Sequence, residues 1–204
     1  LGGTLYPSAY WRNGDVVAHR VTLQIPEWAP VPGLVWLDLK VIDGDGALLV
    51  FDQRGQDTLS LGPWRVRGAV EIPDTANRVD ACLGAGIEFA AYDLATEDDH
   101  LLIDLYWRSI GEPEGDATVF FHLFGTTGDL VAQDDGVPAG GAYPTSWWLE
   151  GDVVRDRHVV SATGEAALVL RIGMYTPETG IRLPAFGPDG ERLEGDAVVL
   201  HLPR

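Results

Sequence analysis

The chain has 204 residues, of which 46% are hydrophobic, so it is long and apolar enough to bury a core. Its 31 Asp and Glu residues outnumber its 14 Lys and Arg residues, which gives a formal net charge of −17 at pH 7. Such a charge repels the polyanionic backbone of nucleic acid, so the composition excludes nucleic acid as a favoured partner.

Two absences in the sequence limit the protein class. Cys82 is the one cysteine, so no disulfide within the chain can form. No run of about 18 apolar residues indicates a membrane helix, and no signal peptide is visible. The chain starts at Leu1 without a methionine, and we expect from this that it is part of a longer protein. Whether the rest of that protein contains a membrane segment stays open.

A stretch near the start of the chain occurs again in the second half. Residues 6–20 and 143–157 agree at eight of fifteen positions, including Tyr, Pro, Trp, Gly and Asp. Residue frequencies alone predict roughly one match. Each copy therefore predicts a Tyr-Pro-aromatic turn, a strand after Gly-Asp, a second strand and a closing hairpin. The similarity continues more weakly, pairing 37–43 with 170–176 and 50–55 with 185–190.

The two copies differ in what precedes them. Residues 79–141 stand before the second copy, whereas the first copy begins five residues into the chain. Two explanations stay open: the chain starts inside a tandem of similar domains, or the first copy completes its sheet by packing on the second. Apolar anchors are few in residues 67–80, so we predict a partial sandwich unit at 1–70 and a complete sandwich domain at 71–204.

Two-residue periodicity predicts strands through the chain. In residues 100–109, Leu101, Ile103, Leu105 and Trp107 fall on one face and the polar residues mostly on the other. No helical period of useful length competes with this pattern. The 25 glycines and 13 prolines supply many turns between short strands. The sequence predicts an all-β fold of about eleven or twelve strands, built as a tandem antiparallel β-sandwich, jelly-roll or Ig-like, with its first unit incomplete.

The second copy alternates in the same way over residues 153–160 and 168–175. Upstream of it, the pattern predicts that the complete unit opens with a strand whose members are Ile87, Phe89, Ala91 and Asp93.

Catalytic signatures with recognisable spacing are absent. The sequence contains no G-x-S-x-G, no H-E-x-x-H, no Gly-Lys-Ser/Thr phosphate loop and no G-x-G-x-x-G after a strand. The five histidines lack ligand-like spacing, and His122, between Phe121 and Leu123, is expected to be structural. With 31 acidic residues, adjacent acids arise by chance and do not nominate a glycosidase pair. We predict no catalytic residue.

Polar candidates lie in the second half of the chain. Asp134 and Asp135 precede the second Tyr-Pro motif in a long loop, where they either supply oxygen ligands for Ca²⁺ or cap backbone N–H groups. No other metal or cofactor is predicted. Arg182 is expected to pair with an acidic neighbour or to bind a sugar hydroxyl.

Aromatic residues gather at the two repeat loops, where an exposed ring face can stack on the C–H side of a sugar. Trp11 and Trp148 share one repeat position, so we expect both to be packing anchors. Tyr10 and Trp147 stand one place earlier and point the other way, which makes them the predicted ligand contacts together with Tyr143.

The second unit resembles a known family. The resemblance is carried by DLYWRS at 104–109, by the stretch from FFHLFG to RDRHVV at 120–160, and by LRIGMYTPETGIRLPAFGPDG at 170–190. These runs look like the soluble β-sandwich that follows the membrane-spanning region in many bacterial glycosyltransferases of the protein O-mannosyltransferase-like class. The similarity covers about 87–200, and residues 5–66 look like the tail of a preceding copy. In such proteins the catalytic acids sit in the membrane part, so no catalytic residue carries over.

Three functional hypotheses follow. The first is a non-catalytic accessory region of a membrane glycosyltransferase, on the extracytoplasmic face, which binds carbohydrate or acceptor and has the parent membrane domain as its partner. The second is a purely structural or protein-interaction sandwich with buried repeat aromatics. The third is a glycoside-processing enzyme, which requires two carboxyl groups about 5–10 Å apart in a cleft.

Overall fold

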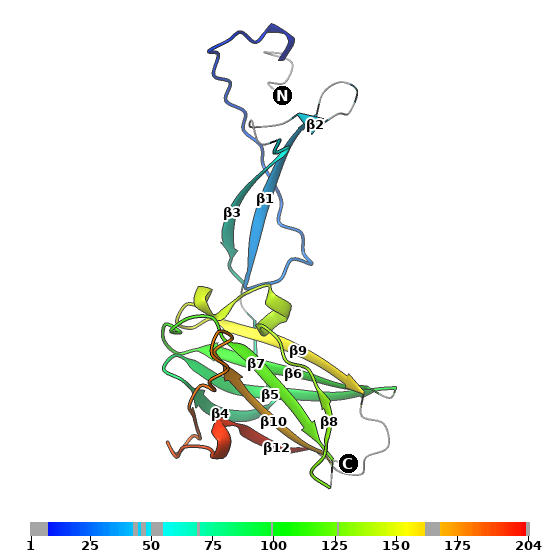
Figure 1. The fold of residues 1–204 in the computed structure, drawn as a ribbon, viewed down its shortest axis with the longest axis vertical. Helices are drawn as coiled ribbons and strands as arrows, with labels where there is room; N and C mark the ends of the chain where they lie inside the picture. The colour runs from blue at the N-terminus through cyan, green and yellow to red at the C-terminus, as the bar shows by residue number, and fades with distance from the viewer. Residues whose placement is uncertain are drawn as a thin grey trace.

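The described residues form an all-β structure, as the sequence predicts. The computed structural model contains twelve strands and four 3-10 turns in these residues, and none of its helices is long and apolar enough to cross a bilayer. Figure 1 shows a slender arm, the described part of residues 8–66, standing on a compact sandwich. The description covers residues 8–42, 45, 48–49, 55–68, 70–98, 100–125, 127–161 and 168–202.

The sandwich consists of two antiparallel sheets. One sheet has five strands in the order β11-β4-β5-β6-β9, and the other has four in the order β12-β10-β7-β8. The five strands are β4 (Asn77–Leu83), β5 (Ile87–Glu97), β6 (His100–Ser109), β9 (Val153–Ser161) and β11 (Ala185–Phe186). The four are β7 (Thr118–Phe124), β8 (Leu130–Gln133), β10 (Leu168–Tyr175) and β12 (Val198–Leu202).

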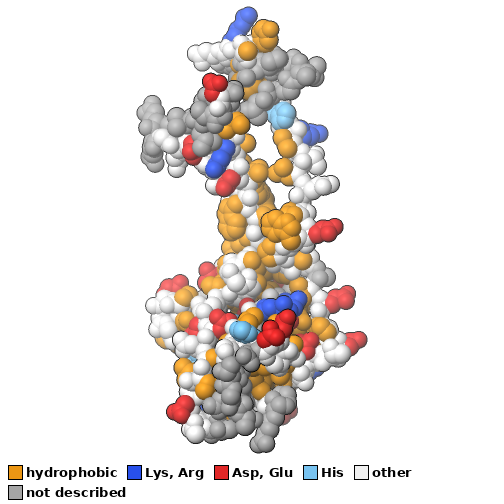
Figure 2. Space-filling view, turned by 90° about the vertical axis from the view of Figure 1, so that its right-hand side faces the viewer, with side chains coloured by type: hydrophobic (Ala, Val, Ile, Leu, Met, Phe, Trp, Pro, Cys, Tyr) orange, Lys and Arg blue, Asp and Glu red, His pale blue; other side chains and the backbone are white. Residues whose placement is uncertain are grey.

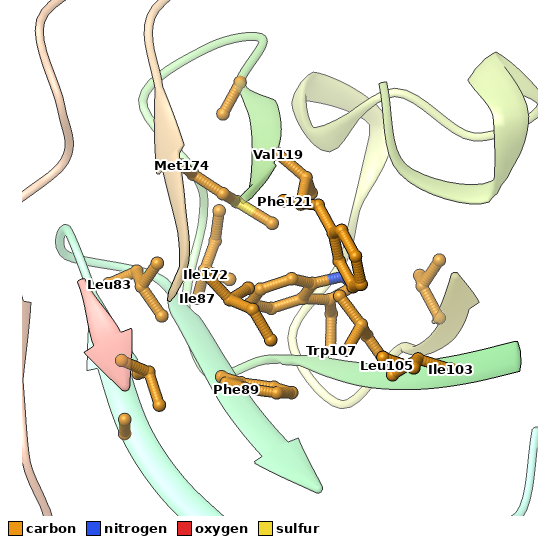
Figure 3. Close-up of a cluster of buried hydrophobic side chains, with 14 of the residues drawn as sticks. Leu83, Ile87, Phe89, Ile103, Leu105, Trp107, Val119, Phe121, Ile172 and Met174 are labelled. Atoms are coloured by element: carbon orange, nitrogen blue, oxygen red, sulfur yellow. The ribbon is translucent and has the colours of Figure 1, made fainter. Parts of the chain in front are cut away.

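The core lies between these sheets and is centred on Trp107. The four alternate residues predicted for β6 are all buried, with Trp107 fully so, which confirms the expected face. Figure 3 shows Trp107 between Phe89 of the same sheet and Phe121 and Ile172 of the facing sheet. The Phe89 and Trp107 ring centroids are 4.8 Å apart. The period-two pattern of β6 thus supplies the largest side chain of the core.

The predicted opening strand is wrong in two respects. The sheet begins one strand earlier, at β4, which pairs with β5. A bulge in β5 between Phe89 and Ala91 shifts the register against β6, so that Phe89 faces the main core while Ala91 faces outward. There Ala91 packs in a second, small cluster with Ala76 and Tyr106. A bulge inserts one residue and reverses the faces beyond it, which simple alternation does not reveal.

The arm contains a three-stranded sheet in the order β2-β1-β3. Its main part is the antiparallel pair of β1 (Gly33–Ile42) and β3 (Thr58–Val66), with β2 (Leu48–Leu49) at the edge. At its lower end Leu34 donates a backbone hydrogen bond of 3.0 Å to the carbonyl of Ala142, which ties the arm to the sandwich.

The repeated motif folds alike in both copies only at the local level. The turn η1 (Ser8–Tyr10) corresponds in the repeat to η3 (Thr145–Trp147). Asp15 accepts from the backbone N–H of Arg12 at 2.9 Å, and Asp152 accepts from the corresponding N–H of Leu149, also at 2.9 Å.

The strand expected after Gly-Asp forms in one copy only. In the second copy it is β9, which pairs with β6. In the first copy residues 16–25 contain no strand, which corrects the prediction, because no described strand lies beside them to complete the hydrogen bonding.

Candidate functional site

Residues 143–152 of the second copy, here called the aromatic loop, are held together by hydrogen bonds among themselves. Tyr143 is fully buried, and its hydroxyl lies 2.6 Å from Asp152 Oδ2 and 2.7 Å from the carbonyl oxygen of Trp147. Burial, together with the hydrogen bond and charge of Asp152, raises the pKa of Tyr143 well above its usual range. The indole Nε1 of buried Trp148 donates to the carbonyl of Tyr143 at 2.9 Å. Trp148 is thus the packing residue expected, whereas Tyr143, a predicted ligand contact, is closed off from any ligand.

The remaining aromatic candidates are placed differently from one another. Trp147 is partly buried and packs against the core. Tyr10 is 69% exposed on the arm, far along the chain from the sandwich loop. Trp11 is 39% exposed, so the expectation that it matches the surroundings of Trp148 is wrong. The structure therefore does not bring the aromatic candidates together into one surface.

His158 and two aspartates join the two sheets. The buried imidazole of His158, on β9, lies between two carboxylates: Nδ1 is 2.9 Å from Asp134 Oδ2 and Nε2 is 3.1 Å from Asp156 Oδ2. The Phe121 ring, from the facing sheet, stacks on it with centroids 4.5 Å apart and planes 11° apart. Burial by itself lowers the pKa of His158, but the hydrogen bonds and charges of Asp156 and Asp134 outweigh burial and raise it. When the ring is protonated, it can donate to both carboxylates.

This network fixes a prediction for pH dependence. A histidine whose pKa is raised by folding contributes stability that is complete below its unfolded pKa, about 6.5, and that is lost as pH rises through the folded value. Urea unfolding from pH 5 to pH 9 should therefore show a loss of stability above pH 6.5 that the His158→Gln variant lacks. The exposed His201 serves as the matched control, since His201→Gln should keep the wild-type profile. Parallel curves for wild type and His158→Gln would contradict the assignment.

The second predicted acid, Asp135, pairs with a different histidine. Its Oδ1 lies 3.1 Å from His122 Nε2 and accepts from the backbone N–H of Phe121 at 3.2 Å. Both carboxylates of the predicted calcium loop thus contact protein donors, and Asp135 caps a backbone N–H group. Among the residues that the structure describes, no group of three or more His, Cys, Asp or Glu side chains is arranged to hold a metal ion.

Arg182 contacts a backbone carbonyl and an aromatic ring, and not the acidic side chain that the sequence led us to expect. Its Nη1 donates to the carbonyl of Gly195 at 2.7 Å, and its guanidinium carbon lies 4.2 Å from the centroid of the Phe120 ring. This combination of a carbonyl acceptor and a ring face holds the 176–183 loop against β7.

A groove at the foot of the arm gathers basic side chains from both halves of the chain. Two hollows of about 530 and 430 Å³ adjoin there and share Pro32 and Val70 in their walls. Figure 2 shows basic side chains gathered at one place on the sandwich, whereas acidic ones are spread over the molecule. We call the two adjoining hollows together the junction groove. Its arginines are Arg65, Arg67, Arg155 and Arg157.

Two of these guanidiniums are held by one carboxylate. Asp104 Oδ1 accepts from Arg157 Nε at 2.8 Å, and its Oδ2 accepts from Arg157 Nη2 at 2.9 Å and from Arg155 Nη2 at 2.6 Å. Burial by itself raises the pKa of Asp104, but the hydrogen bonds of Arg157 and then Arg155 outweigh it and lower the pKa to about 2. One negative charge thus faces two positive charges, and about half of each arginine side chain stays exposed.

A third guanidinium, contributed by the arm, lines the groove on the side of β3. Arg65, on β3, donates from Nη2 to the carbonyl of Trp147, which fixes β3 to the aromatic loop. Its Nε is buried and has no hydrogen-bond partner. Pro30, Pro32 and Val70 supply apolar walls beside these donors. The groove therefore combines fixed guanidinium donors with small apolar faces.

The sequence reasoning missed this groove, although one signal for it was present. The alternation of β9 that places Val154, Asp156 and His158 inward also places Arg155 and Arg157 together on the outer face. The contributions of Arg65 and Arg67 depend on how the arm meets the sandwich, for which the chain has no local signature.

Comparison with known proteins does not identify the chain. No protein-family model matches it, and no curated protein matches its sequence. Two solved structures resemble part of it. The crystal structure of the C-terminal domain of Wzt has a TM-score of 0.41 and 10% identity, over 65% of this chain and 80% of that chain. The structural-genomics target SoR45 has a TM-score of 0.30 and 12% identity, over 61% of this chain and 87% of that chain. Likeness this weak carries no argument about function.

Proposed function

We propose that this chain is a non-catalytic carbohydrate-binding β-sandwich and that the junction groove is its binding surface. The observation that supports this is the set of guanidiniums that Asp104 and the Trp147 carbonyl hold in place beside proline and valine side chains. A guanidinium fork donates two parallel hydrogen bonds to neighbouring oxygens, such as the two oxygens of a sugar carboxylate or adjacent hydroxyls. The apolar walls suit the C–H faces of a sugar ring.

The charge balance of the groove favours sugars that carry carboxylate groups. Two guanidiniums share Asp104, so the hollow that holds Arg155 and Arg157 keeps a net positive charge. Glu150 and Asp152 line the other hollow beside Arg65 and Arg67, and the whole chain carries −17. An acidic sugar is attracted at short range by the arginines of the groove and repelled at long range by the negative charge of the rest of the surface. Short acidic oligosaccharides should therefore bind more tightly than neutral ones, and long polyanions should gain less.

The cellular context of this proposal comes from the sequence. Residues 87–200 resemble the soluble sandwich that follows the membrane region in bacterial glycosyltransferases, which supports an accessory region on the extracytoplasmic face that holds glycan or acceptor for a parent enzyme. The complete gene product tests this context. Eight or more apolar spans in the same polypeptide would support it, and their absence would remove it.

Removing one groove arginine should weaken glycan binding about tenfold or more. A hydrogen bond to a charged group contributes about 1.5–3 kcal/mol, and Arg155→Ala removes such donors while leaving the bidentate pair of Arg157 and Asp104 in place. A glycan array would select ligands, and titration calorimetry would compare wild type with Arg155→Ala and Arg67→Ala. Arg171→Ala is the matched control, because Arg171 lies on β10 in the other sheet.

The outcome also decides between this proposal and a purely structural sandwich. Buried Tyr143 and Trp148 favour the structural alternative, since the repeat aromatics there serve packing. If the wild-type chain binds no sugar on the array, the carbohydrate proposal fails. If sugars bind but Tyr10→Ala or Trp147→Ala weakens binding while the arginine variants do not, the site lies at the repeat aromatics and not in the groove.

A further inference from the structure

The two hollows of the junction groove differ in charge. The smaller one, of about 430 Å³, holds Arg155 and Arg157, and we call it the arginine hollow. Because these two guanidiniums share the single carboxylate of Asp104, one positive charge remains in excess there. The larger one, of about 530 Å³, is called the mixed hollow, and its two positive and two negative side chains, which cancel in charge, are Arg65, Arg67, Glu150 and Asp152.

The hollows follow one another along the same stretch of chain. Residues 149–153 line the mixed hollow, and Val154, Arg155 and Arg157 line the arginine hollow. Val153, Arg155 and Arg157 alternate on the outer face of β9, which pairs with β6 over this stretch. From Val153 to Arg157 the strand rises by roughly 13 Å, at about 3.3 Å per residue. This length accommodates two linked sugar rings, one in each hollow.

Two of the four charged groups in the mixed hollow are already held by the protein. Asp152 accepts from a tyrosine hydroxyl at 2.6 Å and from a backbone N–H at 2.9 Å. Arg65 donates to a backbone carbonyl of the aromatic loop. Glu150 and Arg67, in contrast, are exposed and have no hydrogen bond or ion pair with any residue that the structure describes. One carboxylate and one guanidinium are therefore open to a ligand in this hollow.

We propose that the junction groove selects a disaccharide unit with a single carboxylate: the sugar acid lies in the arginine hollow, a neutral ring lies in the mixed hollow, and Glu150 excludes a second carboxylate. This inference rests on the carbohydrate binding proposed above, and it names the class of sugar and a residue that selects it. A hydroxyl group both donates and accepts, so a neutral ring can donate to Glu150 and accept from Arg67. A second carboxylate would accept from Arg67 but would also meet the like charge of Glu150.

An amino sugar fits the mixed hollow less well than a neutral ring. Its ammonium group would pair with Glu150, but the same hollow also holds two guanidiniums, which repel it. Since the charges of this hollow cancel, a cation and an anion each meet as much repulsion as attraction there. Hydroxyl groups meet neither and use both kinds of side chain.

Three disaccharides that differ only in the oxidation of their terminal CH₂OH groups test the inference. Cellobiose has no carboxylate, cellobiouronic acid has one, and β-1,4-linked diglucuronic acid has two. Where a glycan array selects another linkage, the same three oxidation states are compared in that linkage. In titration calorimetry at pH 7 the sugar with one carboxylate should bind most tightly, at least about fivefold more tightly than the sugar with two, because like charges at contact distance repel even beside water.

Glu150→Gln removes the charge of the selecting residue and keeps its size. In this variant the ratio of the affinity for the one-carboxylate sugar to that for the two-carboxylate sugar should fall by at least about fivefold. Glu178→Gln is the matched control, because it makes the same change at an exposed glutamate that lines a different hollow. It should keep the wild-type ratio. Arg155→Ala should narrow the preference for cellobiouronic acid over cellobiose, which places the sugar acid in the arginine hollow.

The outcomes separate this inference from the function on which it rests. If the wild-type chain binds the two-carboxylate sugar as tightly as the one-carboxylate sugar, the inference is overturned while carbohydrate binding stands. The same holds if Glu150→Gln leaves the ratio unchanged, or if Glu178→Gln lowers it equally, since the effect then comes from the overall charge. If the wild-type chain binds no sugar on the array or in solution, carbohydrate binding itself is overturned, and this inference with it.

Discussion

Trp107→Ala should lower the free energy of unfolding of the sandwich by about 3–5 kcal/mol, the largest effect we expect from a single substitution. Trp107 is the largest fully buried side chain, and it contacts Phe89 in its own sheet and the facing sheet across the core. Its Nε1 also donates to Asp156 at 3.3 Å, so the substitution leaves a cavity and removes one hydrogen-bond donor from a buried carboxylate. With a marginal stability of about 5–15 kcal/mol, the variant should melt roughly 10 °C or more below wild type.

The same change on the arm is the control for this prediction. Trp64→Ala removes an indole that is 49% exposed, so it should cost less than about 1 kcal/mol in the main transition. Chemical denaturation followed by far-ultraviolet circular dichroism measures both variants. Equal losses would show that the arm unfolds as part of the sandwich, contrary to its few contacts with it.

Asp156→Ala should cost about 3–5 kcal/mol, comparable with the loss of the core indole. The side chain of Asp156 is only 4% exposed and satisfies three donors: the His158 ring, the Trp107 indole and the backbone N–H of Ala139 at 3.0 Å. Truncation leaves these donors buried without their acceptor, which costs more than the hydrogen bonds themselves contribute. Because the pKa of His158 is held up chiefly by Asp156, the variant should also lose the pH dependence described above.

Asp134 provides the matched control on the other side of the same imidazole. Its side chain is 48% exposed, so Asp134→Ala should cost about 1 kcal/mol or less, since water replaces the lost contact. Unfolding in urea at pH 5 and pH 8 separates the two variants. A loss for Asp134→Ala as large as that for Asp156→Ala would mean that the charge of the pair, and not burial, sets the cost.

The sequence predicted those parts of the fold that depend on local pattern. The alternation of β6 placed Trp107 in the core, and the repeat placed Trp148 at a packing position, because burial on one face of a strand requires period two. The same pattern put Asp156 and His158 inward on β9, but inward polar residues are interpretable only when their partners are known. Those partners come from elsewhere in the chain: Trp107 lies on β6, and Asp134 directly follows β8.

The first copy shows where local pattern stops being sufficient. The turn and the aspartate cap recur in both copies, since they are satisfied within a few residues. Trp11 and residues 16–25 do not reproduce the burial and the strand of their counterparts, because these require a neighbouring sheet. For the same reason the junction groove was not predicted, since Arg65 and Arg67 join Arg155 and Arg157 only where the arm reaches the sandwich.

The position of the groove has a thermodynamic consequence. One of its walls, with Pro32 and Arg65, belongs to the arm, and the other, with Arg155, belongs to the sandwich. A sugar that bridges the walls, as the proposed function has it, restrains the arm against the sandwich. Linkage requires the converse by the same factor: a restraint that holds the two walls at the spacing of the bound state raises sugar affinity as much as bound sugar strengthens that restraint.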